Sequence, residues 1–251
     1  MYKLLTFIIS VAILSACSTV DRGNFGSFER SLNNKSHGYS IVEDPTKSAP
    51  VEMVEVFEVR PGDCTGDEKW NDCEKDRERS ELSGNNHNYP GNNYPGNEYW
   101  YGWFIYFPED YPNVYPTKTA LGQFHQKKGK VIWMFQHNQT GYHLDDQARG
   151  SKYYKLIDES ELRGKWHRIG VQVHWSLNKE GYFRVWANGA QKVDYSGPTM
   201  TARQAYFKYG VYRSFMSRYK NRFNVDQVPT QKVYFANVRR GNSRESLQPP
   251  K

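Results

Sequence analysis

The sequence has few cysteines, weak helical periodicity and only a short apolar run. Cys64 and Cys73 have no further Cys or His close by at metal-ligand spacing, which argues against a metal site there. The apolar run at 4–14 is eleven residues long, too short to cross a membrane as a mature helix. Little Leu and Ala, together with the weak helical periodicity, argue against a helical bundle.

Aromatic side chains, by contrast, are abundant: 19 Tyr, 13 Phe and 7 Trp, or 16% of 251 residues. Because apolar residues reach only 37%, Tyr and Trp must supply much of the buried area. A chain of this length can form one large all-β domain. Its net charge of +7 suits a polyanion, which at this point can be nucleic acid, an anionic glycan or a membrane surface.

The N-terminus has the features of an export signal. Lys3 precedes the apolar run, which ends in Leu14-Ser15-Ala16-Cys17. This pattern resembles a bacterial lipobox, so we expect residues 1–17 to be a lipoprotein signal peptide with lipidation at Cys17. Ser18 at the next position favours the outer membrane, facing the periplasm or the cell surface. An ordinary secretory signal with an incidental Cys is the alternative.

Export limits which partners the protein can meet and indicates the oxidation state of the two remaining cysteines. It argues against nucleic acid as the physiological partner, and we expect a monomer held by its lipid anchor. In an oxidising compartment, Cys64 and Cys73 are expected to form a disulfide that closes a small polar loop.

The rest of the chain predicts a single domain of many short strands. Polar residues 18–36 predict a tether, 37–240 the folded domain and 241–251 a frayed tail. Strand-like runs are expected at 39–42, 51–60, 99–107, 120–126, 131–137, 166–177, 182–187, 191–195, 205–213 and 232–238. Asn188-Gly189 is a hairpin signal, and short helical pieces are expected only near 157–162 or 202. This pattern predicts a β-jelly roll sandwich of two antiparallel sheets, with a concanavalin-like architecture.

A direct repeat at 88–97, Asn-Tyr-Pro-Gly-Asn twice over, has turn residues and little capacity to enter a core. It predicts a long surface loop. The loop is either an aromatic-tipped lid over a binding face or a neutral insertion.

Three segments place polar groups at every second position. They are DRERSEL (76–82), GQFH (122–125) and YFKYGVY (206–212). Alternate residues of a strand point to one face, so each segment presents its polar set on one side and its apolar set on the other. The face so formed collects Arg77, Arg79, Glu81, Gln123, His125, Tyr206, Lys208 and Tyr212. A basic surface with a Tyr and a His suits an anionic substrate that must lose a proton.

The same segments resemble the motifs of jelly-roll polysaccharide lyases, R-S/T-E-L, Q-x-H and Y-F-K-x-G-x-Y. The stretches at 60–64, 165–176 and 181–189 are most similar to the glucuronan lyase and heparinase I-like group, which is related to jelly-roll alginate lyases. Tyr209 stands where alginate lyases often have Ala, and it should face away from the site. The resemblance extends over about residues 37–240.

This resemblance implies β-elimination at a uronic acid. By position, Arg79 and Gln123 neutralise the substrate carboxylate. Tyr212 is the catalytic base or acid with His125 as its partner, for either syn or anti elimination. Lys208 is expected to lower the pKa of the Tyr212 hydroxyl. No cofactor is required, although some relatives carry a structural calcium ion.

Several residues have plainer explanations. Glu81 is expected to be a structural partner of Arg79 or Arg77. Arg77 is either a surface charge or a substrate contact, Tyr206 is either core or substrate contact, and His137 is either a contact to a neighbouring sugar or a solvated strand end.

The leading function is a lyase of an anionic, uronate-containing polysaccharide, with glucuronan as the first candidate and alginate as the second. A non-catalytic, lipid-anchored glycan-binding jelly roll is the alternative. It explains the charge and the aromatic residues, but gives less reason for His125, Lys208 and Tyr212 to occupy these positions. A glycoside hydrolase would need two carboxylates on one face, a pattern that no strand carries.

Overall fold

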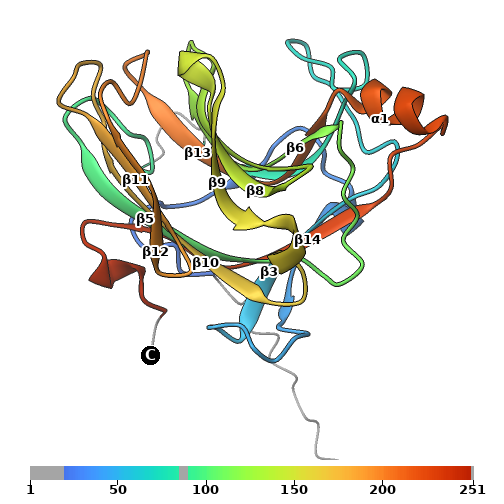
Figure 1. Cartoon of the computed structure of the whole chain (residues 1–251), viewed down its shortest axis with the longest axis horizontal. Helices are drawn as coiled ribbons and strands as arrows, with labels where there is room; N and C mark the ends of the chain where they lie inside the picture. Colours follow the sequence, from blue (N-terminus) through green and yellow to red (C-terminus); the bar gives the residue numbers. More distant parts are fainter. Residues whose placement is uncertain (1–19, 85–89, 250–251) are drawn as a thin grey trace, which may run out of the picture.

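Two antiparallel sheets of seven strands each make up the fold in a computed structural model that describes residues 20–84 and 90–249. The first sheet has the order β1-β4-β13-β6-β7-β8-β9 and the second β12-β11-β10-β5-β14-β3-β2. Figure 1 shows the first sheet curving, with its concave side turned away from the second sheet.

The strands of the first sheet are β1 (Glu29–Arg30), β4 (Arg77–Ser83), β13 (Ala205–Ser214), β6 (Lys118–Gln126), β7 (Val131–Asn138), β8 (Gly141–Asp146) and β9 (Lys152–Asp158). Those of the second are β12 (Ala190–Ser196), β11 (Tyr182–Ala187), β10 (Trp166–His174), β5 (Glu98–Tyr106), β14 (Gln231–Gly241), β3 (Met53–Val59) and β2 (Tyr39–Glu43). The helical pieces are η1 (Ser36–Gly38), η2 (Gln147–Arg149), η3 (Glu159–Glu161), α1 (Met216–Phe223) and η4 (Glu245–Leu247).

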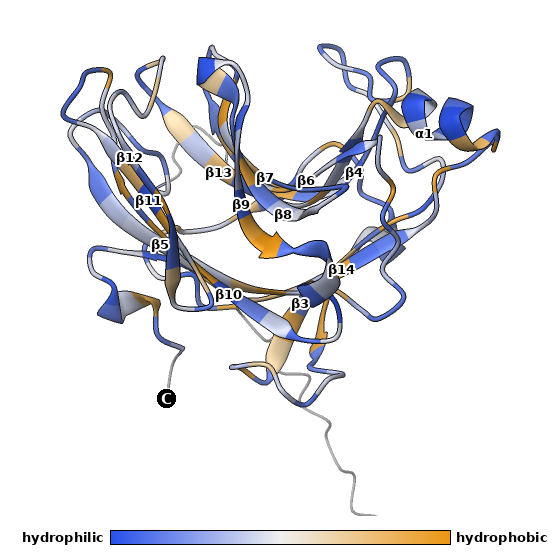
Figure 2. Ribbon diagram, in the orientation of Figure 1, coloured by the Kyte–Doolittle hydropathy of each residue, from blue (hydrophilic) through white to orange (hydrophobic). Residues whose placement is uncertain are grey.

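The predicted jelly roll and its single domain are confirmed. The expected hairpin joins β11 to β12, where Asn188 and Gly189 both have positive φ. The sequence did not predict β8, β9 or α1. The helical piece expected near 157–162 is the end of β9 followed by the single turn η3, and the described helix lies at 216–223 and not near 202. Figure 2 shows α1 as mostly hydrophilic, at the rim of the molecule.

Aromatic rings fill the space between the sheets. Phe124 and Phe207, from neighbouring strands of the first sheet, meet with ring centroids 4.9 Å apart, and Trp103 of the second sheet packs 5.4 Å from Phe207. The residues alternating with Phe124 and Phe207 therefore turn to the opposite, concave face of the first sheet. Tyr209 also faces inward, as expected, and donates its hydroxyl hydrogen to Glu55 at 2.8 Å.

The segment predicted to be a tether is part of the packed domain over its described length. Phe25 is buried against Phe207 and Tyr101, and Arg22 forms an ion pair with buried Glu55. β1 also pairs with β4 at the edge of the first sheet. The burial of Phe25 and the Arg22–Glu55 ion pair thus attach to the domain a stretch that its polar composition predicted to be a tether.

The predicted frayed tail and the predicted surface loop likewise contain residues that pack into the domain. In the 241–251 tail, Leu247 of η4 is buried under Gly102. In the repeat, Asn93 is fully buried, exchanges backbone hydrogen bonds with Ala205 and accepts a hydrogen bond from the Tyr101 hydroxyl. The signal peptide with Cys17, and residues 85–89 of the repeat loop, lie outside the described residues. No helix in the described ranges is long and apolar enough to span a bilayer.

Candidate active site

Three neighbouring strands, β4, β13 and β6, bring the predicted polar residues onto one face. Across β13 and β4, Tyr212 pairs with Arg79 and Gly210 with Glu81. Across β13 and β6, Lys208 pairs with Gln123 and Tyr206 with His125. Because β13 is the middle strand, the motifs that are far apart in sequence become direct cross-strand neighbours.

Glu81 is the centre of this group. Its carboxylate accepts hydrogen bonds from Gln123 Nε2 at 2.6 Å, from Lys208 Nζ at 2.8 Å and from Arg79 Nη1 at 3.3 Å. Only 1% of Glu81 is exposed, so these contacts replace water around a buried charge. The expected structural role of Glu81 toward Arg79 is confirmed, and the structure adds Gln123 and Lys208 as partners.

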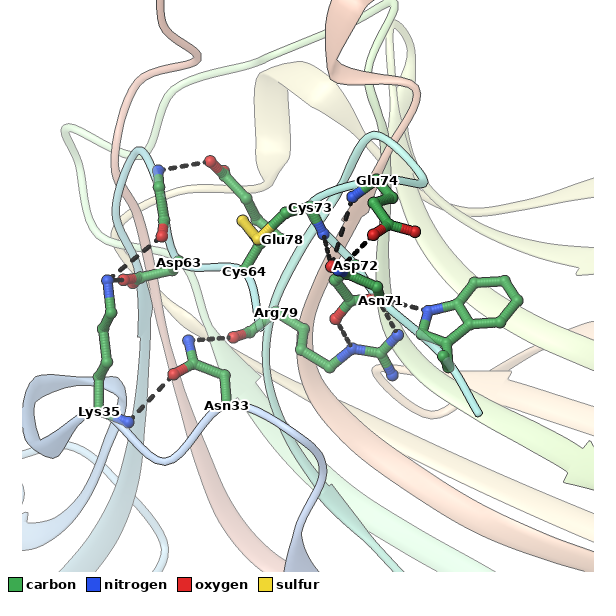
Figure 3. The surroundings of a disulfide bond; sticks show 12 residues. Asn33, Lys35, Asp63, Cys64, Asn71, Asp72, Cys73, Glu74, Glu78 and Arg79 are labelled. Carbon is green, nitrogen blue, oxygen red and sulfur yellow. Dashed lines mark hydrogen bonds and ion pairs between the residues drawn. A yellow bond between two sulfur atoms is a disulfide. The ribbon is translucent and has the colours of Figure 1, made fainter. Parts of the chain in front are cut away.

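Arg79 is held from the other side by the disulfide loop. Asp72 accepts hydrogen bonds from Arg79 Nε at 2.5 Å and Nη2 at 2.6 Å, a bidentate pair that Figure 3 shows beside the Cys64–Cys73 bond. The predicted disulfide is present, with the two Cα atoms 5.1 Å apart. It closes the loop that carries Asp72, the residue through which the loop contacts Arg79 on the candidate site face.

Charge on Arg79 is secured by these contacts. Burial alone would lower the pKa of the guanidinium, but the hydrogen bonds of Asp72 and the charges of Glu81 and Asp72 outweigh it and raise the pKa. Bonds to Asp72, Glu81 and Ser31 occupy four of the five N–H donors. Arg79 therefore offers a substrate its charge and one remaining donor.

Tyr212 lies at one end of the group, partly exposed. The Arg79 guanidinium carbon is 4.4 Å from the centroid of its ring. Burial raises the pKa of the Tyr212 hydroxyl, and the charges of Arg79 and Arg77 oppose this rise without cancelling it. Tyr212 is thus a protonated phenol at neutral pH, and its hydroxyl forms no hydrogen bond within the described part of the chain.

His125 lies at the other end, stacked on Tyr206 with ring centroids 5.4 Å apart. Its Nδ1 is 2.9 Å from the backbone oxygen of Gln126, which leaves Nε2 for a ligand. Burial lowers the pKa of His125, and the Lys208 charge lowers it further, so the ring is neutral at pH 7. Burial also raises the pKa of Tyr206 to about 12.

The expected influence of Lys208 on Tyr212 is not what the structure shows. Lys208 is bonded to Glu81, and the cations that act on Tyr212 are Arg79 and Arg77. Burial lowers the pKa of Lys208 itself, with partial compensation from Glu81. The four-residue spacing correctly predicts that Lys208 and Tyr212 share a strand face, but it does not predict that Lys208 bonds to Glu81.

Of the other three residues predicted to contact substrate, two lie on the site face and one does not. Arg77 lies on the site face beside Tyr212, where its guanidinium packs 4.3 Å from the Phe215 ring. Tyr206 also belongs to this face. His137 does not: it is buried on the inward side with Tyr111, and its Nε2 is 2.6 Å from Glu159 Oε2. It shares strand parity with the core residues Trp133 and Phe135, and this alternation was the signal in the sequence.

A second polar group on the same sheet was not predicted. Buried Asp145 of β8 accepts hydrogen bonds from Gln136 Nε2 at 2.9 Å and Lys118 Nζ at 3.1 Å. Gln136 pairs with Ala120, the cross-strand neighbour of Tyr212, so this group continues the polar face toward β8. In residues 20–84 and 90–249, no three His, Cys, Asp or Glu side chains are grouped as a metal ion would require.

Comparisons with known proteins agree with this arrangement. A family model described as polysaccharide lyase matches residues 20–239. An endo-β-1,4-glucuronan lyase from the fungus Trichoderma reesei is similar with a TM-score of 0.65 and 17% identity, over 93% of this chain and 99% of that one. An alginate lyase from Pseudomonas aeruginosa has a TM-score of 0.52 and 15% identity, over 84% of this chain and 88% of that one.

At these identities the two structures establish the shared fold, and a search of curated proteins gave no match. The family model is a separate line of evidence, because it matches most of the sequence. It covers all the strands that carry the site. The chain therefore belongs to the polysaccharide lyase family.

Proposed function

We propose that this lyase cleaves a uronic-acid-containing anionic polysaccharide by β-elimination. The observation that carries the proposal is the convergence of Arg79, Gln123, His125, Lys208 and Tyr212 on one face of β4, β13 and β6. Removal of the weakly acidic C5 proton requires stabilisation of the enolate that develops on the carboxylate. A rigid cationic surface with two groups for proton transfer meets that requirement.

The substrate carboxylate is proposed to lie beside Tyr212. Arg79 supplies a fixed charge there, and Arg77 adds a second cation on the same face, held by a hydrogen bond from its Nη1 to the Asp76 backbone oxygen at 3.2 Å. Gln123 donates one amide hydrogen to Glu81, so its second amide hydrogen and its carbonyl oxygen are left to contact the substrate. Lys208 is proposed to hold Glu81 and the strand pair in place rather than to touch the reacting atoms.

The two proton transfers are assigned to the residues at the two ends of the site, His125 and Tyr212. Neutral His125 is suited to accept the C5 proton, and protonated Tyr212 is suited to donate to the departing 4-O oxygen. Environments that separate two pKa values in this way are typical of acid–base pairs. This assignment favours anti elimination, whereas syn elimination would require Tyr212 to perform both transfers.

Glucuronan is the first candidate substrate and alginate the second. The glucuronan lyase is similar over nearly the full length of both chains, with a higher TM-score than the alginate lyase. The chemistry needs no cofactor, and a structural calcium ion stays a prediction.

The test uses the chain without residues 1–17 and follows the ultraviolet absorbance of the unsaturated uronate product. Glucuronan, alginate blocks, heparin and hyaluronan are compared. We expect a signal on one polymer that Tyr212→Phe loses by at least about 100-fold. Tyr234→Phe, on the outer face of the second sheet, is the matched control. Full activity of Tyr212→Phe would refute its role, and binding of a polymer without cleavage would favour the glycan-binding alternative.

We also propose that the protein is exported and anchored through lipidated Cys17, in the outer membrane. Support comes from the lipobox-like sequence that ends in Cys17; the packed residues Arg22 and Phe25 follow it a few positions later in the chain. The full chain expressed in a bacterium should incorporate labelled palmitate and sediment with outer membranes. A Cys17→Ser variant should lose the label, and retention of the label would exclude this anchor.

A further inference from the structure

The outer face of the second sheet carries a pocket, on the opposite side of the two-sheet sandwich from the candidate active site. Outward-facing Gly102 of β5 pairs with Gly170 of β10, and Gly170 pairs in turn with Trp186 of β11. A Cβ added at Gly170 would meet no atom within 4 Å. The glycines leave a depression of about 310 Å³ in the surface of a central, fully paired part of the sheet.

Aromatic rings form one wall of this outer pocket. Trp100 and Trp186 stack on each other with centroids 5.3 Å apart and an interplanar angle of 25°. Both are only partly buried, whereas Trp103, on the inward side of the same strand, is 2% exposed. The core therefore does not require the pair, and a flat apolar surface of this kind packs well against the C–H face of a pyranose ring.

Two arginines border the same space. The Arg168 guanidinium lies 5.8 Å from the Phe104 ring, and that of Arg244 lies 5.7 Å from Trp186. Within the described residues, neither forms an ion pair with a carboxylate. Exposed Glu245 follows Arg244 and offsets part of its charge, so Arg168 is the principal cation. A guanidinium with free donors is the group best suited to bind a carboxylate.

Local structure keeps the pocket open in the absence of a ligand. Asn188, in the hairpin turn at its rim, accepts a hydrogen bond from the Arg168 backbone N–H at 2.9 Å. Its side-chain amide also lies 3.0 Å from His167 Nδ1. Leu247 of η4 packs over Gly102 on the other side. Because the pocket is formed by residues on paired strands, ligand binding costs little conformational entropy.

We infer that the outer pocket is a second, non-catalytic binding site for a uronate residue of the polysaccharide. The Trp100–Trp186 stack would bind the sugar ring and Arg168 its carboxylate. The identity of the occupant rests on the proposed function. Because both sheets separate the pocket from Tyr212, a sugar bound there holds the polymer near the enzyme without being cleaved. Such tethering raises the effective concentration of long chains at the catalytic face.

Binding is tested in the Tyr212→Phe background, so that cleavage does not interfere. The probes are purified glucuronan and alginate oligosaccharides, with a neutral glucan as comparison, and the readouts are tryptophan fluorescence and calorimetry. Gly170→Leu fills the pocket without deleting a side chain, and Arg168→Gln removes the charge. Arg184→Gln, on the same face but paired with Asp194 at 3.0 Å, is the matched control.

We expect Gly170→Leu and Arg168→Gln to weaken binding of the anionic probe at the outer pocket about tenfold or more, with Arg184→Gln unchanged. In the active enzyme the same two variants should raise KM for the polymer but not for a short oligosaccharide. Equal anionic binding in all variants overturns the inference even if cleavage is observed. Equal binding of the neutral glucan overturns the carboxylate assignment. Pocket-dependent anionic binding without cleavage supports the pocket and counts against the proposed reaction.

Discussion

Replacement of Asp72 by Asn tests whether the disulfide loop positions Arg79, the arginine proposed to neutralise the substrate carboxylate. Asp72 is fully buried and holds Arg79 through bonds of 2.5 and 2.6 Å. The substitution keeps the shape of the side chain but removes its charge and one of the two strong acceptors. Arg79 then keeps only Glu81, at 3.3 Å, as a charged partner.

The expected loss of stability follows from leaving the buried Arg79 charge without its main anionic partner. Removing one partner of a buried ion pair costs about 3–5 kcal/mol, and the remaining contact to Glu81 places this case near 3 kcal/mol. For a domain of this size that is a fall in Tm of roughly 6–12 °C. Because a misplacement of about 1 Å in a catalytic group costs around 100-fold in rate, kcat should fall by about that factor.

The measurements are thermal unfolding by circular dichroism and the rate of unsaturated-uronate formation. Glu74→Gln is the matched control, because Glu74 is exposed, directly follows the disulfide loop and accepts a hydrogen bond from Asn71 at 3.0 Å. It should change neither quantity. If Asp72→Asn behaves like Glu74→Gln, the loop does not hold Arg79 and the proposed link from the disulfide to the site is wrong.

Three further predictions concern the same site. Glu81→Gln should lower stability by about 3–5 kcal/mol in urea unfolding, since Lys208 and Arg79 lose their shared buried anion; a loss below 1 kcal/mol would contradict its central position. The pKa of His125 is lowered from 6.5, so kcat/KM should fall only as pH drops through a value below 6.5, and His125→Ala should abolish that limb; an unchanged limb in the variant would assign it to another group. The double variant Cys64→Ser/Cys73→Ser should lose about 2–3 kcal/mol of stability, measured by unfolding. It should also lose turnover, measured by initial rates. Full turnover at a temperature where the variant is folded would show that Asp72 holds its place without the disulfide.

The face on which the site residues lie could be predicted from the sequence, because strand orientation is local. In GQFH and YFKYGVY, alternation alone separates Gln123 and His125 from Phe124, and Lys208 and Tyr212 from Phe207. The same rule, applied to Trp133, Phe135 and His137, identifies His137 as inward-facing. The polar ring of His137 suggests a contact to sugar, but its strand parity places it in the core beside Tyr111.

Contacts between segments distant in sequence could not be predicted in this way. Nothing in the local pattern around Asp72 indicates that it meets Arg79, or that Phe25 enters the core from a stretch rich in Ser, Asn and Gly. Both depend on which strands become neighbours and on the space left between the sheets, and a polar composition reports neither.

By itself, the sequence determined the strand periodicity, the aromatic core, the disulfide pair and the set of polar residues on one face. These follow from backbone geometry at period two and from the family motifs, which are short-range properties of the chain. Only the tertiary structure decided that Glu81 joins Arg79, Gln123 and Lys208, and that Lys208 acts on Glu81 instead of on Tyr212. The physical reason is that burial and partner choice fix the charge of each group, and both arise only when β4, β13 and β6 lie side by side.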